Sequence, residues 1–243
     1  VDIIRWLFRR INRNNNTTMT DLQEIAKGVG AAAKPMFGID VSHHNGAIKW
    51  AEVAKNVPKV DFAFIKATEG SSTKDKRCFY NATEAAKNGI PISYYHFATL
   101  NREDEVADAK EEAQFFLDTV ATLPPNNLPL VLDIESTSPK AVLDDGEVLA
   151  YIKAFFGVLE AAGKDYALYS YSPFLNEHLP ADHNLGAVKL WVAAYTNKPT
   201  PKLPAGWSKY WIWQYKGSAP GFIGKCAGIS TACDLNKTEV AIL

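Results

Sequence analysis

An uninterrupted apolar run that ends in two carboxylates constrains this chain more than any other feature. The run is Leu128-Pro129-Leu130-Val131-Leu132-Asp133-Ile134-Glu135. A continuous apolar run of this length is typical of a strand buried on both faces of a parallel sheet. Because side chains alternate along a strand, Asp133 and Glu135 lie on one face and Ile134 on the other. The run therefore predicts two acids side by side at the end of an interior strand.

Two neighbouring acids have two interpretations. Mutual repulsion and low local polarity raise the pKa of one of them, which gives a site a proton donor beside an ionised partner. Alternatively, such a pair caps nearby helix N-termini or accepts hydrogen bonds from loop amides. The pair alone favours neither interpretation, so the rest of the chain has to decide between them.

The size and charge of the chain narrow the class of protein. With 243 residues, of which 47% are hydrophobic, the chain is long enough for one large core, and α/β barrels of this size form a single domain. Its 26 Lys and Arg against 27 Asp and Glu give a formal net charge of −1, so no global basic field favours nucleic acid as a partner. A carbohydrate or a small neutral substrate suits this composition better.

The cysteines and histidines do not form a metal-binding pattern. Cys226 and Cys233 would close a small loop by a disulfide in an oxidising compartment and leave Cys78 alone, and three reduced thiols are the alternative. The sequence has no paired Cys-x-x-Cys spacing, and the side chains of the adjacent His43 and His44 are expected to diverge. We expect no structural metal and no cofactor.

The first residues differ in character from the rest. Residues 1–13 interleave apolar side chains with arginines. The segment is too short and too charged to span a bilayer, and it lacks the uninterrupted apolar centre of a secretory signal. We expect an amphipathic helix that docks on the domain or links to an upstream domain, with membrane-surface contact as the alternative. A polar linker over 12–20 and a short helix over 20–29 follow. The predicted boundary separates 1–35 from a main domain of 36–243.

In the main domain, strands and helices alternate. The predicted strands span residues 37–42, 60–67, 92–97, 128–135, 166–172, 189–195, 210–216 and 231–235. The predicted helices span residues 48–55, 75–88, 102–122 and 145–162, and Gly89 and Gly163 end the second and the fourth. Five strand-helix units followed by three strands joined by loops predict an irregular, TIM-barrel-like β/α barrel of the α/β class. Such alternation requires parallel strands with right-handed crossovers.

In a β/α barrel the chemistry lies at the carboxyl ends of the strands. Polar residues end most of the predicted strands: Asp40 and Ser42; Lys66, Thr68 and Glu69; Tyr95 and His96; Asp133 and Glu135; Tyr195; Asp234 and Asn236. All of these residues would face one mouth of the barrel. Several coincidences would be needed if they were only strand-end caps, so the pattern favours a catalytic site.

The motifs at these strand ends resemble those of a known enzyme family. They are Gly38-Ile39-Asp40-Val41-Ser42, residues 62–70, Tyr95-His96-Phe97, residues 128–135, residues 190–195, Trp213-Gln214-Tyr215 and Asp234-Leu235-Asn236. In order and spacing they resemble the family 25 glycoside hydrolases, which are lysozymes of the Chalaropsis type, or N-acetylmuramidases. The resemblance runs from about Phe37 to the C-terminus. It implies a barrel of five β/α units plus three strands, and cleavage of the β-1,4 bond between N-acetylmuramic acid and N-acetylglucosamine in peptidoglycan.

The resemblance also assigns roles to residues. It implies that Glu135 is the proton donor, that Asp133 is its partner, that Asp40 and Asp234 line the same cleft, and that Tyr95 lies beside the reacting sugar. Since glycoside cleavage needs a proton on the leaving oxygen, Glu135 has to be neutral, and we expect burial and Asp133 to raise its pKa. Three roles for Asp133 stay open: orienting the 2-acetamido group of the substrate, acting as nucleophile, or acting as the base for water.

Other residues near the mouth of the barrel are expected either to bind substrate or to have structural roles. Lys66 either pairs with a cleft acid or binds a saccharide. Further candidates for substrate binding are Tyr195, Trp213 and Gln214. At least half of the aromatic side chains on the late strands are expected in the core rather than against sugar. We expect Glu69 to be structural and His96 to be a hydrogen-bonded core residue.

Two other functions are alternatives, namely a chitinase-like hydrolase and a non-catalytic cell-wall-binding module. The chitinase-like family shares the D-x-E strand end, but its longer run of spaced acids is absent because Leu130 and Val131 precede Leu132. Four acids present together argue against a degenerate module, and no internal repeat indicates a binding array. We expect a monomer that acts on peptidoglycan glycan strands, in an extracellular, periplasmic or phage-delivered setting.

Overall fold

The computed structural model describes residues 34–100, 104–136, 145–239 and 242. The chain divides into two units, Val1–Lys34 and Pro35–Leu243, and the fold described below belongs to the second. The helix, linker and second helix expected over residues 1–29 lie outside the described residues, and the domain boundary stays a prediction. Within the described residues, no helix has the length and apolar character needed to cross a membrane.

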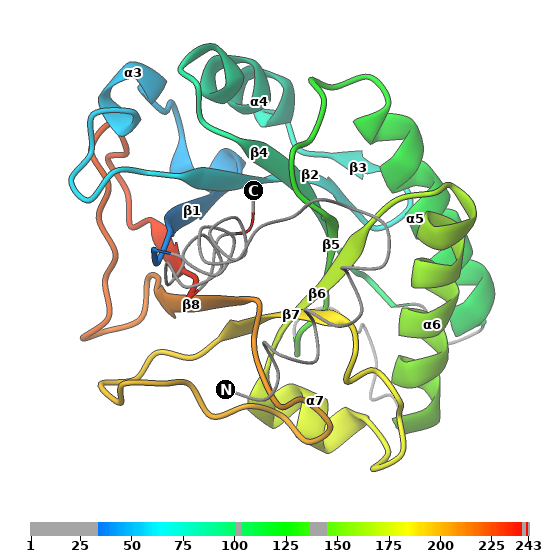
Figure 1. Cartoon of the computed structure of the whole chain (residues 1–243). Helices are drawn as coiled ribbons and strands as arrows, with labels where there is room; N and C mark the ends of the chain where they lie inside the picture. The colour runs from blue at the N-terminus through cyan, green and yellow to red at the C-terminus, as the bar shows by residue number, and fades with distance from the viewer. Residues whose placement is uncertain (1–33, 101–103, 137–144, 240–241, 243) are drawn as a thin grey trace, which may run out of the picture. The chain divides into compact units, whose positions relative to one another are not determined.

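Eight strands of the described chain form a closed ring (Figure 1). They are β1 (Phe37–Val41), β2 (Phe62–Glu69), β4 (Ile92–Phe97), β5 (Leu130–Asp133), β6 (Tyr166–Tyr171), β7 (Lys189–Ala193), β8 (Ile212–Lys216) and β9 (Asp234–Lys237). Each strand pairs with the next in this order, and β9 pairs back with β1. A short strand, β3 (Thr73–Lys74), extends the sheet beyond β2. The predicted barrel is confirmed.

The helices lie outside the ring of strands (Figure 1). They are α3 (Trp50–Val53), α4 (Cys78–Lys87), α5 (Glu105–Val120), α6 (Asp145–Ala161) and α7 (Ser172–His178). One helix follows each of the first five barrel strands, which confirms the count of five strand-helix units. Gly89 and Gly163 have φ values of 71° and 66° just after α4 and α6, as their positions predict. The sequence does not reveal α7, because 7 residues are too few to show helical periodicity.

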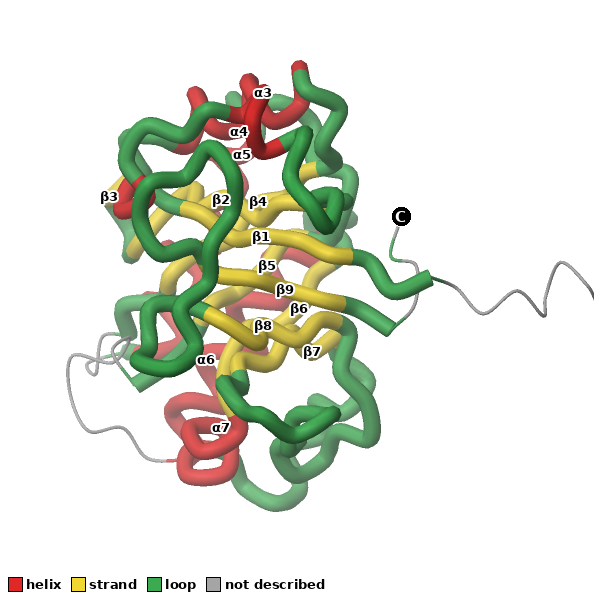
Figure 2. Tube along the Cα trace, turned by 90° about the vertical axis from the view of Figure 1, so that its left-hand side faces the viewer, coloured by secondary structure: helices red, strands yellow, loops and turns green. Residues whose placement is uncertain are grey.

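Strand β9 departs from the predicted parallel pairing. It runs antiparallel to both β1 and β8, whereas the other neighbouring barrel strands are parallel. Figure 2 shows β1, β9 and β8 side by side. The loop between β8 and β9 contains no helix and returns the chain beside β8 in the opposite direction. The expectation that Asp234 ends the last strand is therefore wrong: Asp234 begins β9, and the reversal brings it to the mouth beside Asp40.

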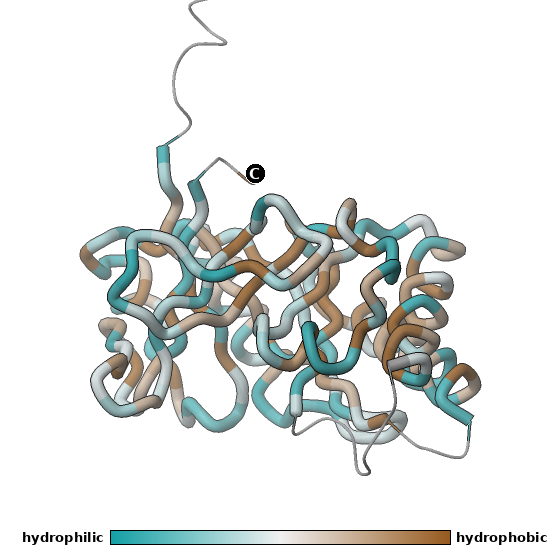
Figure 3. The backbone as a smooth tube through the Cα atoms, turned by 90° about the horizontal axis from the view of Figure 1, so that it is seen from below, coloured by the Kyte–Doolittle hydropathy of each residue, from teal (hydrophilic) through white to brown (hydrophobic). Residues whose placement is uncertain are grey.

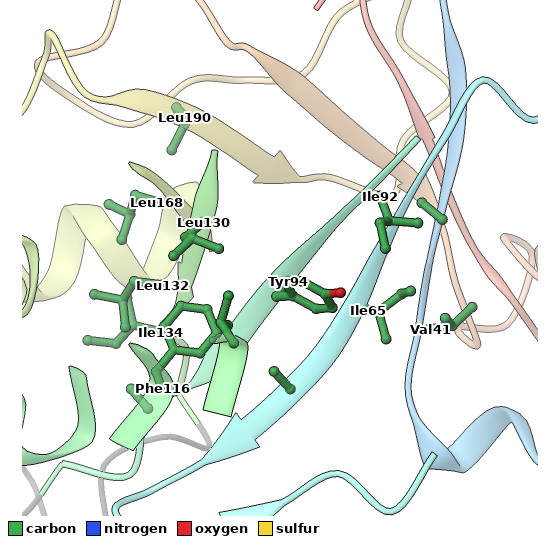
Figure 4. Packing of buried hydrophobic residues seen from close by; sticks show 14 of the residues in the cluster. Val41, Ile65, Ile92, Tyr94, Phe116, Leu130, Leu132, Ile134, Leu168 and Leu190 are labelled. Carbon is green, nitrogen blue, oxygen red and sulfur yellow. The ribbon is translucent and has the colours of Figure 1, made fainter. Parts of the chain in front are cut away.

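The strands separate two layers of apolar side chains. Hydrophobic stretches run through the interior, whereas hydrophilic stretches predominate in the outer loops (Figure 3). Leu130, Leu132 and Ile134 face outward from the β5 segment and pack near Phe116 of α5 (Figure 4). Val131 and other inward residues form a second cluster inside the barrel. Ile134 thus lies opposite its acidic neighbours, as strand alternation predicts.

Candidate active site

A cavity of about 730 Å³ lies at the mouth where β1, β2, β4 and β5 end and where β9 begins. Eight of the nine predicted site residues line it: Asp40, Lys66, Tyr95, Asp133, Glu135, Tyr195, Gln214 and Asp234. The parallel strands bring residues that are far apart in the sequence to one edge of the barrel. The reversed β9 adds Asp234 to the same edge.

Trp213 is the predicted site residue that lies elsewhere. Neighbouring positions on β8 face opposite sides, so Gln214 lines the cavity while Trp213 packs in the outer core. Trp213 Nε1 donates a hydrogen bond to the Ala194 carbonyl at 2.8 Å, and Lys237 Nζ lies 4.1 Å from the centre of a Trp213 ring. Its position corrects the expectation that Trp213 binds substrate.

Asp133 and Glu135 form a pair inside the cavity. Asp133 is the last residue of β5 and is buried, whereas Glu135 is half-buried and lies nearer to solvent. Asp133 hydrogen-bonds to Glu135. Two carboxyl groups can form such a bond only when one of them holds a proton, because ionised carboxylates accept and do not donate. The second oxygen of Asp133, Oδ1, is buried and has no hydrogen-bond partner among the described residues.

Burial is the main reason why the pKa values of this pair are raised. The pKa of Asp133 lies well above its ordinary value because of burial and, next, the charge of Glu135. Burial and then the charge of Asp40 raise the pKa of Glu135, while Lys66 and the hydrogen bond from Asp133 lower it. The expectation that Asp133 raises the pKa of Glu135 is therefore wrong in sign. The charge of Glu135 raises the pKa of Asp133 while the hydrogen bond from Asp133 opposes the rise at Glu135, so the two carboxyl groups titrate as a unit.

Asp40 accepts two hydrogen bonds at one carboxylate oxygen. Its Oδ2 accepts from Gln214 Nε2 at 3.0 Å and from Asn236 Nδ2 at 2.7 Å. Burial raises the pKa of Asp40 from 3.8 to about 6, and these two hydrogen bonds oppose the rise. By contrast, burial and the charges of Asp40 and Glu135 raise the pKa of Asp234 to about 8. The pKa of Asp40 therefore lies below that of Asp234, and Asp40 is the first of the two to ionise as the pH rises.

The two amides that hold Asp40 are themselves fixed in orientation. Gln214 Oε1 accepts hydrogen bonds from the hydroxyl groups of Tyr169 and Tyr195, at 2.9 Å and 2.8 Å. Asn236 Oδ1 accepts from Trp191 Nε1 at 2.7 Å. With each amide oxygen engaged by these donors, each amide nitrogen has to face Asp40. Gln214 thus lines the cavity with its amide already engaged by protein groups.

Lys66 pairs with an acid of the same cavity. Its Nζ lies 2.8 Å from Glu69 Oε2 and 4.5 Å from the centre of the Phe97 ring. Lys66 is buried, and its charge lowers the pKa values of both Asp133 and Glu135. The expected ion pair of Lys66 with a cleft acid is therefore present. Glu69 lines the cavity together with Lys66, so its place is in the site itself.

Sequence reasoning missed two residues of the site. Tyr169 lines the cavity from the inward face of β6, and its alternation with the outward Leu168 is a signal that could have found it. Gly217 follows β8, and a Cβ atom there would lie 2.3 Å from the Tyr195 hydroxyl oxygen and 2.6 Å from Asp234 Oδ1. Only glycine lets these two side chains approach the backbone of residue 217 so closely. No sequence pattern marks this glycine.

The histidines are engaged in structural contacts. The rings of His43 and His44 lie with their centres 3.9 Å apart and their planes tilted by 36° instead of diverging, because both residues lie in one 3-10 turn. His43 Nδ1 lies 2.7 Å from Asp75 Oδ2. His96 Nε2 lies 2.7 Å from Glu112 Oε2 in the core, which confirms its expected role. In the part of the chain that the structure describes, no three His, Cys, Asp or Glu residues are placed to hold a metal ion.

The cysteines are present as thiols. All three are buried and free of disulfide bonds. Cys226 and Cys233 lie close enough for their thiols to hydrogen-bond to each other. Of the two expectations for this pair, the reduced form is therefore the one seen.

Comparison with known proteins agrees with this geometry. Residues 39–221 match the family model of the Glycosyl hydrolases family 25. The chain is 32% identical to lysozyme M1 of Streptomyces globisporus over 206 residues, which cover 82% of this chain and 66% of that protein. It is 27% identical to the autolytic lysozyme of Clostridium acetobutylicum over 210 residues, which cover 86% of this chain and 57% of that protein. The chain thus spans less than two thirds of the length of either relative.

The fold is also similar to that of a lysozyme of known structure. The crystal structure of a bacterial lysozyme from Streptomyces coelicolor superposes with a TM-score of 0.72 at 31% sequence identity, covering 84% of this chain and 91% of that one. The matched residues contain Asp40, Asp133 and Glu135, which share one cavity in this structure. The chain therefore belongs to family 25 of the glycosyl hydrolases.

Proposed function

We propose that this protein is a lysozyme that hydrolyses the β-1,4 bond between N-acetylmuramic acid and N-acetylglucosamine in peptidoglycan. The observation that carries the proposal is the Asp133–Glu135 pair, which shares a proton in a cavity that also contains Asp40 and Asp234. Glycoside hydrolysis needs a proton for the leaving oxygen and negative charge near the developing oxocarbenium ion. Membership of family 25 and similarity to two lysozymes support this reading of the cavity.

Glu135 is the proton donor in this proposal. Because Glu135 is less buried than Asp133, its carboxyl is the better placed of the two to reach a glycosidic oxygen. The proton first moves along the hydrogen bond from Asp133 to Glu135. Glu135 then transfers it to the leaving oxygen as the bond to the anomeric carbon breaks. The resulting Glu135 carboxylate takes a proton from the water whose oxygen bonds to the anomeric carbon, and transfer of that proton back to Asp133 restores the starting state.

Asp133 orients the 2-acetamido group of the substrate. Carboxyl groups that flank a scissile bond lie about 5 to 5.5 Å apart when one is the nucleophile and about 6.5 to 9.5 Å apart when one activates water. A hydrogen-bonded pair is closer than either arrangement. The buried and unpartnered Asp133 Oδ1 is a suitable acceptor for the acetamide N–H, within the residues described. Accepting that bond favours ionised Asp133, moves the shared proton to Glu135, and aims the acetamide oxygen at the anomeric carbon.

The remaining residues bind and stabilise the substrate. Ionised Asp40, fixed by its two amide donors, offsets positive charge on the sugar ring. Tyr95 forms a wall of the cavity, and the partly exposed Tyr195 offers an aromatic face for a sugar. Residues 36–243 form the catalytic barrel and residues 1–35 a separate segment. The protein acts as a monomer outside the cytoplasm, where peptidoglycan lies.

The test is the identity of the new reducing end. Purified cell walls are incubated with the protein, reduced with borohydride, hydrolysed and analysed for amino-sugar alcohols. We expect the suspension to clear and muramitol to form, with no products from chitin oligosaccharides. Glucosaminitol in place of muramitol would show cleavage of the other glycosidic bond. Walls that bind the protein without any new reducing end would show a non-catalytic module.

A further inference from the structure

A second cavity adjoins the first at Glu135. It has a volume of about 520 Å³ and shares Glu135, Tyr169 and Tyr195 with the acidic cavity. A molecule whose glycosidic oxygen reaches Glu135 can therefore extend a substituent into the second cavity. Nothing in the mechanism proposed above uses this space.

The walls of the second cavity differ in chemistry from those of the first. Tyr171, Pro173, Ala193 and Ala194 supply mostly apolar surface. Among the described residues that line this cavity, the charged side chains are Glu135, Lys198 and Lys202, and both lysines are exposed. Within the described residues neither lysine has a carboxylate within salt-bridge distance. The cavity thus suits a ligand with an apolar stem and a negatively charged end.

The loop that carries both lysines is tied to the barrel. Ser172 Oγ, at the start of α7, donates a hydrogen bond to the carbonyl of Lys202. Asn176 Oδ1, also on α7, accepts from the Ala205 backbone N–H at 2.8 Å. The backbone of this loop is therefore fixed beside the cavity, while the two ammonium groups remain free to adjust at its rim.

We propose that the second cavity binds the peptide-bearing lactyl substituent of the muramic acid ring at the scissile bond, with Lys198 and Lys202 facing a carboxylate of the peptide. This proposal rests on the lysozyme function proposed above. The lactyl group is an ether at O3, next to the acetamido group at C2 that Asp133 orients. Its methyl group and the first peptide residue match the apolar walls, and the peptide carboxylate matches the lysines. Chitin has no such substituent.

The test compares substrates that differ only in charge. Soluble peptidoglycan strands with free peptide carboxylates are compared with the same strands amidated by carbodiimide and ammonia. Because exposed ion pairs contribute little each, we expect amidation to raise the KM of the wild-type protein by about threefold to tenfold. Lys198→Ala/Lys202→Ala should raise the KM for the charged strands by the same factor, with kcat unchanged and no effect on the amidated strands.

A matched control separates local from general charge effects. Lys209 and Lys225 are exposed and line neither cavity, so Lys209→Ala/Lys225→Ala has the same net charge and should keep the wild-type preference. Strands stripped of peptide by an amidase carry only the lactyl carboxylate and should be insensitive to the Lys198 and Lys202 substitutions. The proposal would be overturned if the lysine substitutions changed the KM for stripped strands, or if amidation left the KM of the wild-type protein unchanged. It would also be overturned if Lys198→Ala/Lys202→Ala kept the preference for charged over amidated strands.

Direct binding distinguishes failure of this proposal from failure of the lysozyme function. Calorimetry with muramyl dipeptide should show binding that weakens by about threefold to tenfold in Lys198→Ala/Lys202→Ala. If hydrolysis is absent but this lysine-dependent binding is present, the function alone is contradicted. If hydrolysis is present but binding is equal in both proteins, the assignment of the second cavity is contradicted.

Discussion

The amide of Asn236 links the acidic cavity to the barrel core, and its removal should destabilise the protein in a pH-dependent way. Asn236 is fully buried. Asn236→Ala removes a donor 2.7 Å from Asp40 Oδ2 and an acceptor 2.7 Å from Trp191 Nε1. A hydrogen bond to a charged group contributes about 1.5–3 kcal/mol and one between neutral groups about 0.5–1.5 kcal/mol. We therefore expect the free energy of unfolding at neutral pH to fall by about 2–4.5 kcal/mol.

The pH dependence follows from the pKa of Asp40. Burial raises this pKa from 3.8 to about 6, so the folded protein prefers protonated Asp40 and loses stability as the pH rises from 3.8 through about 6. At about 1.4 kcal/mol per pKa unit, ionised Asp40 costs the folded state about 3 kcal/mol. The Asn236 hydrogen bond lowers the pKa, so Asn236→Ala raises it further and increases the cost at neutral pH. At acidic pH, where Asp40 is protonated, Asn236→Ala removes only hydrogen bonds between neutral groups.

Urea unfolding followed by circular dichroism, at about pH 4 and about pH 7, measures this difference. Asn81→Ala is a matched control, because buried Asn81 also accepts a hydrogen bond from an indole, that of Trp50 at 3.2 Å, but does not bond to an acid. We expect Asn236→Ala to be more destabilising at the higher pH and Asn81→Ala to be equally destabilising at both. An equal or smaller loss for Asn236→Ala at the higher pH would refute the reasoning.

Two further substitutions test the cavity. Asp133→Asn should lower kcat on cell walls by about 100-fold or more. The variant should stay folded, because the substitution removes a buried acid whose pKa is raised. Near-normal clearing of cell walls by this variant would contradict the role of Asp133. Gly217→Ala places a Cβ 2.3 Å from the Tyr195 hydroxyl oxygen and should raise KM with little change in circular dichroism. Gly157→Ala, where a Cβ has open space, should leave KM unchanged, and equal effects of the two glycine variants would contradict the assignment.

Features that depend on local strand geometry could be predicted from the sequence. Asp133 and Glu135 share a face and Ile134 lies opposite them because alternation is a property of a single strand. The same rule could have separated Gln214 from Trp213, since neighbouring residues on β8 cannot both enter the cavity. The direction of β9 could not be predicted in this way, because it depends on how a loop returns to close the barrel.

Features that depend on the depth of burial and on packing could not be predicted from the sequence. Whether Asp133 raises or lowers the pKa of Glu135 depends on which of the two is more buried, and two residues on one face look equivalent in a sequence. The close approach of both Tyr195 and Asp234 to Gly217 joins three parts of the chain that no pattern connects. The motifs at the strand ends nevertheless located the cavity, because parallel strands deliver their carboxyl ends to one place.

The most direct test of the account is the activity of Glu135→Gln on two substrates. One is peptidoglycan, whose leaving sugar oxygen needs a proton, and the other is an aryl glycoside of the same muramyl sugar, whose leaving group departs without one. If Glu135 is the proton donor, Glu135→Gln loses about 100-fold to 10,000-fold in kcat on peptidoglycan but keeps most of its initial rate on the aryl glycoside. Equal losses on both substrates, or near-normal lysis of cell walls, would contradict the assignment of Glu135 as the acid.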